Sequence, residues 1–330
     1  MPRLASLAIA CGAGPTRPSR IVGRQSFIYR NGPCPRLVRV ITSMRRSYHD
    51  RRPILPMKDV LVGDNQLAGR LIPCGCDGAP LLLCLHGGGC NSQYFHLPGF
   101  SVAERAVRQR FDVLLLDRPG HGLSLPGRSA CPIVEAADLL TRLLEAMMPR
   151  RSSPEVVLLG HSIGGAVALT FAAESRVRIS AVAVSGIGRS PSEAALSWLA
   201  DFEVDRDRVP STDFFFGPKG TYDWRAPIAL RSAAETWHLN EVREVLLALP
   251  RRFDAIAAHL TMPVSIYLSE NEKIWNSTEL ACGKLAERFN NVPHIVSDVL
   301  PAGGHLYELH SKCPQMVQAQ LAFLAAACRR

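Results

Sequence analysis

The segment from residue 156 to residue 173 constrains the fold of this chain most strongly. Its apolar run Val156–Leu159 is typical of a buried strand, and its alanine-rich run Ala166–Ala173 favours a helix. The sequence G-H-S-I-G at residues 160–164 joins them, with a glycine two residues before and after Ser162. Such glycines permit a sharp turn that exposes the serine hydroxyl beside the free N–H groups of a helix start. We therefore predict that Ser162 is a nucleophile; the alternative is an ordinary strand-to-helix turn.

A serine hydroxyl is a weak nucleophile and needs a base within hydrogen-bond reach. In chains with this type of turn, the acid and then the histidine follow the serine in sequence. His305 ends a glycine-rich loop that follows a predicted strand at residues 294–299 and precedes a predicted helix at Gln315–Ala327. This position favours His305 as the base. Three other histidines are less well placed: His161, His294 and His310.

The acid that orients this base is expected in the loop after the buried run Pro263–Leu268. The sequence there is S-E-N-E-K-I-W, and either Glu270 or Glu272 could reach the histidine. For each of them the alternative is a solvated loop carboxylate. The residue pattern alone therefore leaves the acid open between the two.

Acyl chemistry also requires two backbone N–H groups that hold the oxyanion of a tetrahedral intermediate. One should belong to Ile163, the residue after the nucleophile. The other is expected after the apolar run Leu81–Leu85, where H-G-G-G at residues 86–89 lets a carbonyl approach the backbone. Gly88 is the predicted second donor, and His86 is expected to brace the loop. The alternative is a flexible glycine loop without a binding role.

Together these motifs resemble the α/β-hydrolase superfamily, in its single-domain serine-hydrolase branch with an inserted cap. The matching segments are residues 86–89, D-R-P-G-H-G-L-S at 117–124, 160–165, the Glu272 loop and Gly304-His305. The resemblance covers about residues 58–328. It implies that residues 117–124 shape the pocket without a catalytic role, and that Glu272 is the acid. Most members carry aspartate there, so Glu272 is a departure that lengthens the arm by one methylene.

The pattern along the chain agrees with an α/β-hydrolase fold, a mostly parallel sheet with helices on both faces. Strand-like runs alternate with helical patterns at Leu81–Leu85, Val113–Leu116, Val156–Leu159, Ile179–Val184, Val264–Leu268 and His294–Val299, after an expected antiparallel edge hairpin at Lys58–Val62 and Leu67–Pro73. The connection between the strand-like runs Ile179–Val184 and Val264–Leu268 is too long for an ordinary loop. It predicts a cap at residues 186–262 within one domain at 57–330, with helices at Glu193–Leu199 and Asn240–Leu249.

The net charge of +9 is located at the N-terminus. Residues 1–49 contain nine arginines and no acidic residue, so the rest of the chain is balanced and offers no basic excess for nucleic acid. We expect residues 1–56 to be a disordered or targeting extension. A transit peptide fits the composition, but a translation start at Met44 or Met57 or plain disorder is preferred, which predicts a cytoplasmic protein, with an organellar location as the alternative.

Other function classes find little support in the sequence. No apolar run approaches the ~20 residues of a membrane span. The ten cysteines do not follow zinc-site spacing and are expected to be reduced thiols, so no metal is implied. The glycine loops lack the spacing of nucleotide-binding motifs, and no cofactor is implied.

The prediction from the sequence is a serine hydrolase that cleaves an ester or thioester of a small molecule through an acyl-enzyme on Ser162. The cap is rich in aromatic residues, which favours an apolar acyl or aromatic substrate unless the rings form the cap's own core. An acyltransferase would use the same residues. A non-catalytic binding protein is a third reading, and it has no need of a complete set of serine, acid and histidine.

Overall fold

The computed structural model describes residues 39–41, 58–62, 67–281 and 283–328. Within these ranges the strands form one sheet in the order β1-β2-β3-β5-β4-β6-β7-β8-β9. They are β1 (Arg39–Ile41), β2 (Lys58–Val62), β3 (Leu67–Ile72), β4 (Leu81–Leu85), β5 (Asp112–Leu116), β6 (Val156–His161), β7 (Ala181–Ser185), β8 (Val264–Ser269) and β9 (Ile295–Leu300). From β5 to β9 the pairing is parallel, and β1, β2 and β3 pair antiparallel at one edge. The predicted fold class is confirmed.

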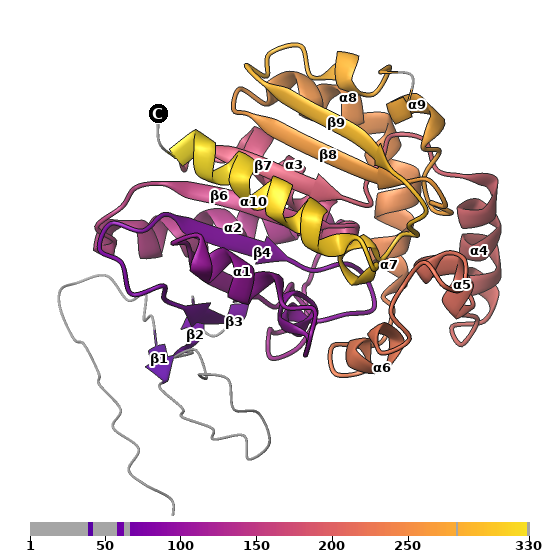
Figure 1. The fold of residues 1–330 in the computed structure, drawn as a ribbon, viewed down its shortest axis with the longest axis horizontal. Coiled ribbons are helices and arrows are strands. Elements are labelled where there is room, and N and C mark those ends of the chain that lie inside the picture. Colours follow the sequence, from indigo (N-terminus) through magenta and orange to yellow (C-terminus); the bar gives the residue numbers. More distant parts are fainter. Residues whose placement is uncertain (1–38, 42–57, 63–66, 282, 329–330) are drawn as a thin grey trace, which may run out of the picture.

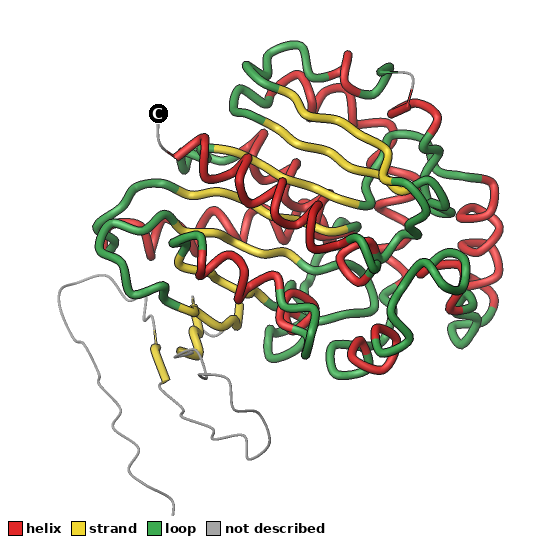
Figure 2. Tube along the Cα trace, viewed as in Figure 1, coloured by secondary structure: helices red, strands yellow, loops and turns green. Residues whose placement is uncertain are grey.

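Helices cover both faces of the sheet (Figure 1). On one face lie α1 (Val102–Arg108) and α10 (Cys313–Cys328), and on the other lie α2 (Pro132–Met147), α3 (Ile163–Glu174) and α8 (Leu249–His259). Figure 2 shows the strands as a central layer between them. Short helical turns complete the described body: η1 (Ser92–His96), η2 (Met148–Arg150), α9 (Thr278–Ala281), η4 (Ala286–Arg288) and η5 (Tyr307–Leu309).

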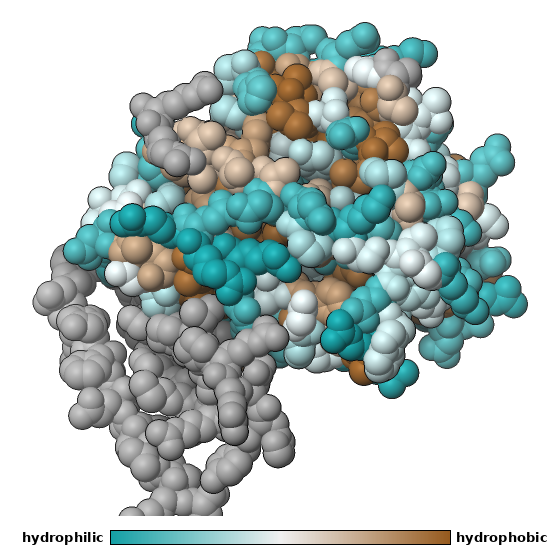
Figure 3. Space-filling model, in the orientation of Figure 1, coloured by the Kyte–Doolittle hydropathy of each residue, from teal (hydrophilic) through white to brown (hydrophobic). Residues whose placement is uncertain are grey.

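The core lies on the two faces of the central strands. Every residue of β4, β6, β7 and β8 is buried, because helices cover the sheet on both sides. The edge strand β9 is partly exposed. Cys84 and Cys90 are buried free thiols, and burial raises the pKa of Cys90 to about 12. The outer surface on the side of α1 and α10 is mainly hydrophilic, with small apolar areas (Figure 3).

A helical segment follows β7 and lies beyond the carboxyl ends of the parallel strands, at the right of Figure 1. It contains α4 (Glu193–Val204), α5 (Thr212–Phe216), α6 (Ala226–Leu230), α7 (Leu239–Arg243) and the π-helical turn η3 (Glu244–Ala248). The two helices expected here correspond to α4 and to the continuous run α7–η3. The next helix, α8, packs against α3 on the body. The predicted cap at residues 186–262 included α8, which lies against α3, so we use the name cap for residues 186–248.

A short strand, β1, lies within residues 1–56, which were expected to form a disordered or targeting extension. It precedes the predicted edge hairpin and pairs with β2, with Arg39 opposite Leu61 and Ile41 opposite Asp59. Backbone hydrogen bonds hold this three-residue edge strand. A segment this short shows no hydrophobic periodicity, so the arginine-rich sequence did not predict it. The expectation of a disordered or targeting extension otherwise concerns residues outside the described ranges.

Among the described residues, no helix combines the length and the apolar character that crossing a membrane requires.

Candidate active site

The turn after β6 places Ser162 at the start of α3 with a backbone conformation that non-glycine residues rarely adopt. Its φ is 53° and its ψ is −122°. The Ser162 N–H donates to the carbonyl of Ser185, at the end of the neighbouring β7, over 2.8 Å. A Cβ on Gly164 would lie 2.0 Å from the carbonyl oxygen of Leu85 on β4, so only glycine fits there. The turn is therefore locked between two neighbouring strands of the sheet.

The three side chains expected to work together are in contact. His305, in the loop after β9, lies with its Nε2 atom 2.8 Å from the Oγ atom of Ser162. Its Nδ1 atom lies 3.0 and 2.9 Å from the two carboxylate oxygens of Glu272, in the loop after β8. Because β6, β8 and β9 end at the same edge of the sheet, their loops converge there.

Glu272 is buried as a charged group. Burial opposes its ionisation, but the facing His305 and a hydrogen bond from the Ile274 N–H hold the pKa of the carboxyl below its ordinary value. An ionised Glu272 accepts a hydrogen bond from the Nδ1–H group of His305. The Nε2 atom of the same ring is then free to accept the hydrogen bond of the Ser162 hydroxyl, which is the arrangement of a general base.

The competing acid and base candidates lie elsewhere. Glu270 accepts the N–H of Ala302 over 2.7 Å and so braces the loop that leads to His305. His310 lies with its Nε2 atom 3.2 Å from the carbonyl oxygen of Ala302, and its Nδ1 atom accepts the N–H of Lys312. The ring of His294 stacks on Phe323 on α10, at 5.8 Å between centroids. None of these three side chains contacts Ser162 in the described structure.

Beside these residues lies a second buried carboxylate that the sequence analysis missed. Glu308, in η5, accepts hydrogen bonds from the hydroxyls of Ser185 and Tyr94, and one of its oxygens lies 3.2 Å from Nδ1 of His161. Burial would raise the pKa of Glu308, but His161 and the two hydroxyls lower it to about 2. The His161 ring lies 5.0 Å from that of His305, centroid to centroid. The only sequence signal for this buried role of Glu308 is that it is a single acidic residue within an otherwise apolar turn.

The glycine loop after β4 borders the serine, as expected. A Cβ on Gly87 would lie 3.2 Å from Cβ of Ser162, and one on Gly88 would lie 2.8 Å from Cδ1 of Ile163. The two predicted oxyanion donors, Gly88 and Ile163, are thus neighbours on one side of the serine. Their role as donors stays a prediction.

His86 braces this loop, as the sequence suggested. Burial and the nearby charge of Arg118 lower the pKa of His86 well below its ordinary value, so the ring is neutral. Its Nδ1–H donates to the carbonyl of Gly87, and its Nε2 accepts the backbone N–H of Arg118. The guanidinium of Arg118 donates in turn to the carbonyls of His86 and Gly87, at 2.9 and 3.1 Å. The sequence analysis placed Arg118 only within a segment that shapes the pocket, without predicting these contacts.

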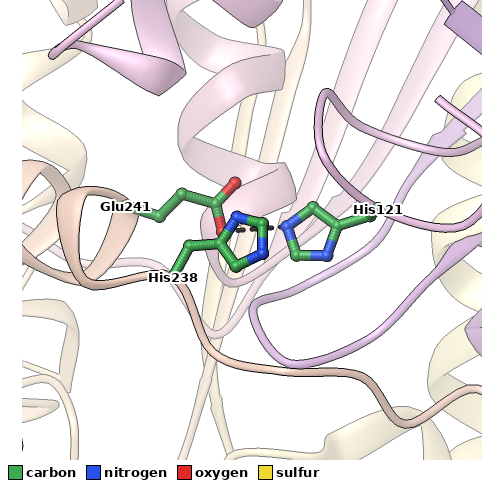
Figure 4. Close-up of side chains that lie close together, drawn as sticks. All are labelled: His121, His238 and Glu241. Atoms are coloured by element: carbon green, nitrogen blue, oxygen red, sulfur yellow. Dashed lines mark hydrogen bonds and ion pairs between the residues drawn. The ribbon is translucent and has the colours of Figure 1, made fainter. Parts of the chain in front are cut away.

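A group of potential metal ligands lies nearby, formed by His121, His238 and Glu241 (Figure 4). Their ligand atoms lie within 4.8 Å of one another. The two imidazole rings, however, stack on each other at 4.5 Å, and Glu241 forms a buried ion pair with Arg118. A guanidinium on the same carboxylate repels a divalent cation, so the donor set does not fit a metal. It fits a network of hydrogen bonds and ion pairs.

Aromatic side chains of the cap lie over the glycine loop and the histidine. A Cβ on Gly88 or Gly89 would lie 2.6 Å from ring atoms of Trp237. The ring of Phe215 stacks on Trp237 at 5.5 Å and lies 6.4 Å from the ring of His305. Trp198 meets Trp237 edge-on at 5.1 Å. These rings form an apolar wall over the glycine loop and His305.

The fold and this arrangement define a class of protein, and comparison with known families agrees. The model of the alpha/beta hydrolase family matches residues 82–317. The chain therefore belongs to the alpha/beta hydrolase family.

Two solved structures are similar in fold. A hydrolase from Pseudomonas aeruginosa PA01 has 18% identity and a TM-score of 0.60, over 81% of this chain and 98% of that one. The carboxylesterase CesB from Bacillus subtilis has 18% identity and a TM-score of 0.58, over 82% and 92%. At these identities the likeness shows the fold.

Curated relatives match over shorter stretches. The dihydrolipoyllysine-residue acetyltransferase component of the acetoin cleaving system of Pseudomonas putida is 29% identical over 133 residues, which is 38% of this chain and 33% of the relative. The matches span 33% to 37% of the length of the curated relatives.

Proposed function

We propose that the protein is a serine hydrolase that cleaves an ester or thioester bond of a small apolar substrate through an acyl-enzyme on Ser162. One observation carries the proposal: the Oγ atom of Ser162 lies 2.8 Å from Nε2 of His305, whose Nδ1 faces the carboxylate of Glu272. A nucleophile bonded to a base that an acid orients is the arrangement that acyl transfer requires. Membership of a hydrolase family supports the same activity.

The mechanism follows from this arrangement. His305 takes the Ser162 proton as the hydroxyl oxygen attacks the substrate carbonyl, and Glu272 stabilises the imidazolium that forms. The N–H groups of Ile163 and Gly88 hold the oxyanion of the tetrahedral intermediate. His305 then gives its proton to the departing alcohol or thiol, which leaves the acyl group on Ser162. Water, deprotonated by His305, releases the acid and restores the serine.

The cap supports an apolar acyl group as substrate. The ring of Trp237 lies against Gly88 and Gly89, and the ring of Phe215 stacks on Trp237 and lies 6.4 Å from that of His305. The carboxylates near the serine already face protein groups, since Glu272 faces Nδ1 of His305 and Glu308 faces Nδ1 of His161. The wall that remains for a substrate is therefore apolar.

An acyltransferase is the second candidate, because the relative from Pseudomonas putida is named as an acetyltransferase component. The same serine, histidine and glutamate would serve, and an alcohol or thiol would replace water in the second step. Hydrolysis of the acyl-enzyme in buffer, measured with and without added alcohol acceptors, separates the two. A rise in ester product at the expense of free acid indicates transfer.

The test is hydrolysis of p-nitrophenyl esters of increasing acyl length by the wild-type protein and by Ser162→Ala and His305→Gln. Each substitution should lower kcat by about 10⁶, and Ser162→Ala should abolish labelling by a fluorophosphonate. His310→Gln is a matched control, since His310 is buried five residues further on without contacting the serine. A wild-type protein without turnover or labelling would favour the binding-protein reading instead.

A further inference from the structure

The cap and the loop of the second oxyanion donor form one continuous contact. Residues 233–235 of the cap run antiparallel to residues 89–91, with Ala234 opposite Cys90. The Asn91 N–H donates to the carbonyl of Ala233 over 2.9 Å, and the Glu235 N–H donates to that of Gly89 over 2.8 Å. The cap is therefore hydrogen-bonded to the backbone of the loop that carries Gly88.

A buried ion pair extends this contact into α7. Glu241 accepts from both terminal nitrogens of the Arg118 guanidinium, one of them at 3.2 Å, and His121 lies 3.1 Å away on the same carboxylate. Arg118 is 1% exposed and Glu241 is 3% exposed. Burial would raise the pKa of Glu241, but the charge of Arg118 and the hydrogen bond of His121 hold it well below its usual range. The cap therefore places the negative charge of Glu241 against the guanidinium of Arg118.

The other side of the same guanidinium holds the oxyanion loop. One terminal nitrogen donates to the carbonyl of Gly87 and Nε donates to that of His86. The carbonyl of Gly87 and the N–H of Gly88 belong to one planar trans peptide, in which they point in opposite directions. Fixing the Gly87 carbonyl therefore fixes the direction of the Gly88 N–H.

We propose that Arg118 is a positioning residue for the oxyanion hole, and that Glu241 of the cap sets its position, so that the cap completes the hole. This inference rests on the proposed function. Substrate groups that shift the cap would then change the rate of the chemical step as well as binding, because they act on the peptide that donates to the oxyanion.

Glu241→Gln tests the inference, because it removes the charge and keeps the shape. A misdirected donor weakens the transition state more than the ground state, and loss of a whole donor costs about 10²–10³ in kcat. We expect kcat at least about tenfold lower with KM within about twofold, and a boronic acid that forms a tetrahedral adduct on Ser162 should lose affinity by the same factor.

Glu244→Gln is the matched control. Glu244 lies three residues further along the cap, is 4% exposed and pairs with Arg252, but its other oxygen accepts the N–H of Ile133 on α2. This variant should lose stability and keep kcat and boronate affinity. A merely structural role of Glu241 would lower the thermal midpoints of both variants and leave kcat per folded molecule unchanged, which would overturn the inference.

A double-mutant cycle with Arg118→Gln adds a second criterion. If Glu241 acts through Arg118, the double variant should be no slower than Arg118→Gln alone, whereas additive losses contradict the proposal. Should Glu241→Gln not fold, Arg118→Lys carries the test, since lysine keeps the charge but not the fork: wild-type kcat in that variant overturns the inference. A wild-type protein without esterase activity would contradict the proposed function itself, which is a separate outcome.

Discussion

The Nδ1 atom of His305 lies almost equidistant from the two carboxylate oxygens of Glu272, at 3.0 and 2.9 Å. The oxygen at 3.0 Å also accepts the N–H of Ile274 over 2.8 Å, within the same loop. The longer glutamate arm therefore folds back on its own backbone and presents its carboxylate to the ring. This geometry accounts for a glutamate carboxylate reaching the ring of His305 from this loop.

Glu272→Gln should lower kcat by about 10⁴, because a neutral amide does not stabilise the imidazolium and favours the wrong tautomer of His305. Glu270→Gln should change kcat far less, since Glu270 contacts the backbone of Ala302 and not the histidine. Hydrolysis of a p-nitrophenyl ester by both variants checks the ranking. The reverse order would move the acid to Glu270.

Glu308→Gln should destabilise the fold by about 1.5–3 kcal/mol, because it replaces the buried carboxylate that accepts from Ser185 and Tyr94 and faces His161 with a neutral amide. Urea unfolding at neutral pH measures the change. The exposed Glu287 offers a control, and Glu287→Gln should stay within about 0.5 kcal/mol of the wild type. A loss as small as that of the control would show that the pair adds nothing to stability.

The pH dependence of unfolding should report the same carboxylate. The folded-state pKa of Glu308 is about 2, below its ordinary value of 4.5, so the unfolded chain binds a proton first as the pH falls. Its stabilisation is complete above about pH 4.5 and is lost towards pH 2, by at most about 1.4 kcal/mol per pH unit. Between these values the free energy of unfolding should fall less steeply in Glu308→Gln than in the wild type. Parallel slopes would contradict a depressed pKa.

Trp237→Ala should extend the range of acyl chains that the enzyme accepts. The ring lies over Gly88 and Gly89, so its removal opens space beside the serine, and each buried methylene of a longer chain contributes about 0.8 kcal/mol. The ratio of kcat/KM for an octanoyl over an acetyl ester should rise. Trp224→Ala is the control, since Trp224 is a cap tryptophan that is 74% exposed. An unchanged ratio would show that the ring does not line the acyl site.

A chain that begins at Met57 should keep its thermal midpoint and kcat/KM. It loses β1, which pairs only with β2 at the sheet edge, and it retains β2, β3 and every residue assigned to the site. Its isoelectric point should fall from about 9.2 towards neutrality, because residues 1–49 carry the net charge of +9. A clearly lower midpoint or kcat/KM would show that the removed residues support the body.

The central sheet and the elbow of Ser162 could be predicted because their signals are local. The strand Leu81–Leu85 agrees with the predicted run residue for residue, since a strand buried on both faces is a short continuous apolar run. The glycines around Ser162 mark a close approach of backbone segments, since a Cβ on Gly164 would lie 2.0 Å from the carbonyl oxygen of Leu85. His305 and the loop of Glu270 and Glu272 could be placed because loops after neighbouring parallel strands meet at one edge of the sheet. The choice of Glu272 came from the resemblance to the hydrolase superfamily.

The partners of the buried charged residues behind the site could not be predicted in this way. Arg118 and Glu241 are 123 residues apart in sequence, and Ser185 and Glu308 are separated by the same number. A charged residue in a loop or helix predicts exposure, and only the fold shows that a partner compensates its burial. Periodicity reports which face is buried, but it carries no information on which charges meet there.

The antiparallel bridge between Cys90 and Ala234 has a consequence for protein engineering. A chimera that received only a relative's cap would lose the partners of the Gly89 carbonyl and the Asn91 N–H, together with the carboxylate on Arg118. Residues 86–91 and 233–241 therefore form the smallest unit that can be exchanged as a whole. Recombination for new substrates should cross over outside both segments, so that the cap and the glycine loop are inherited together.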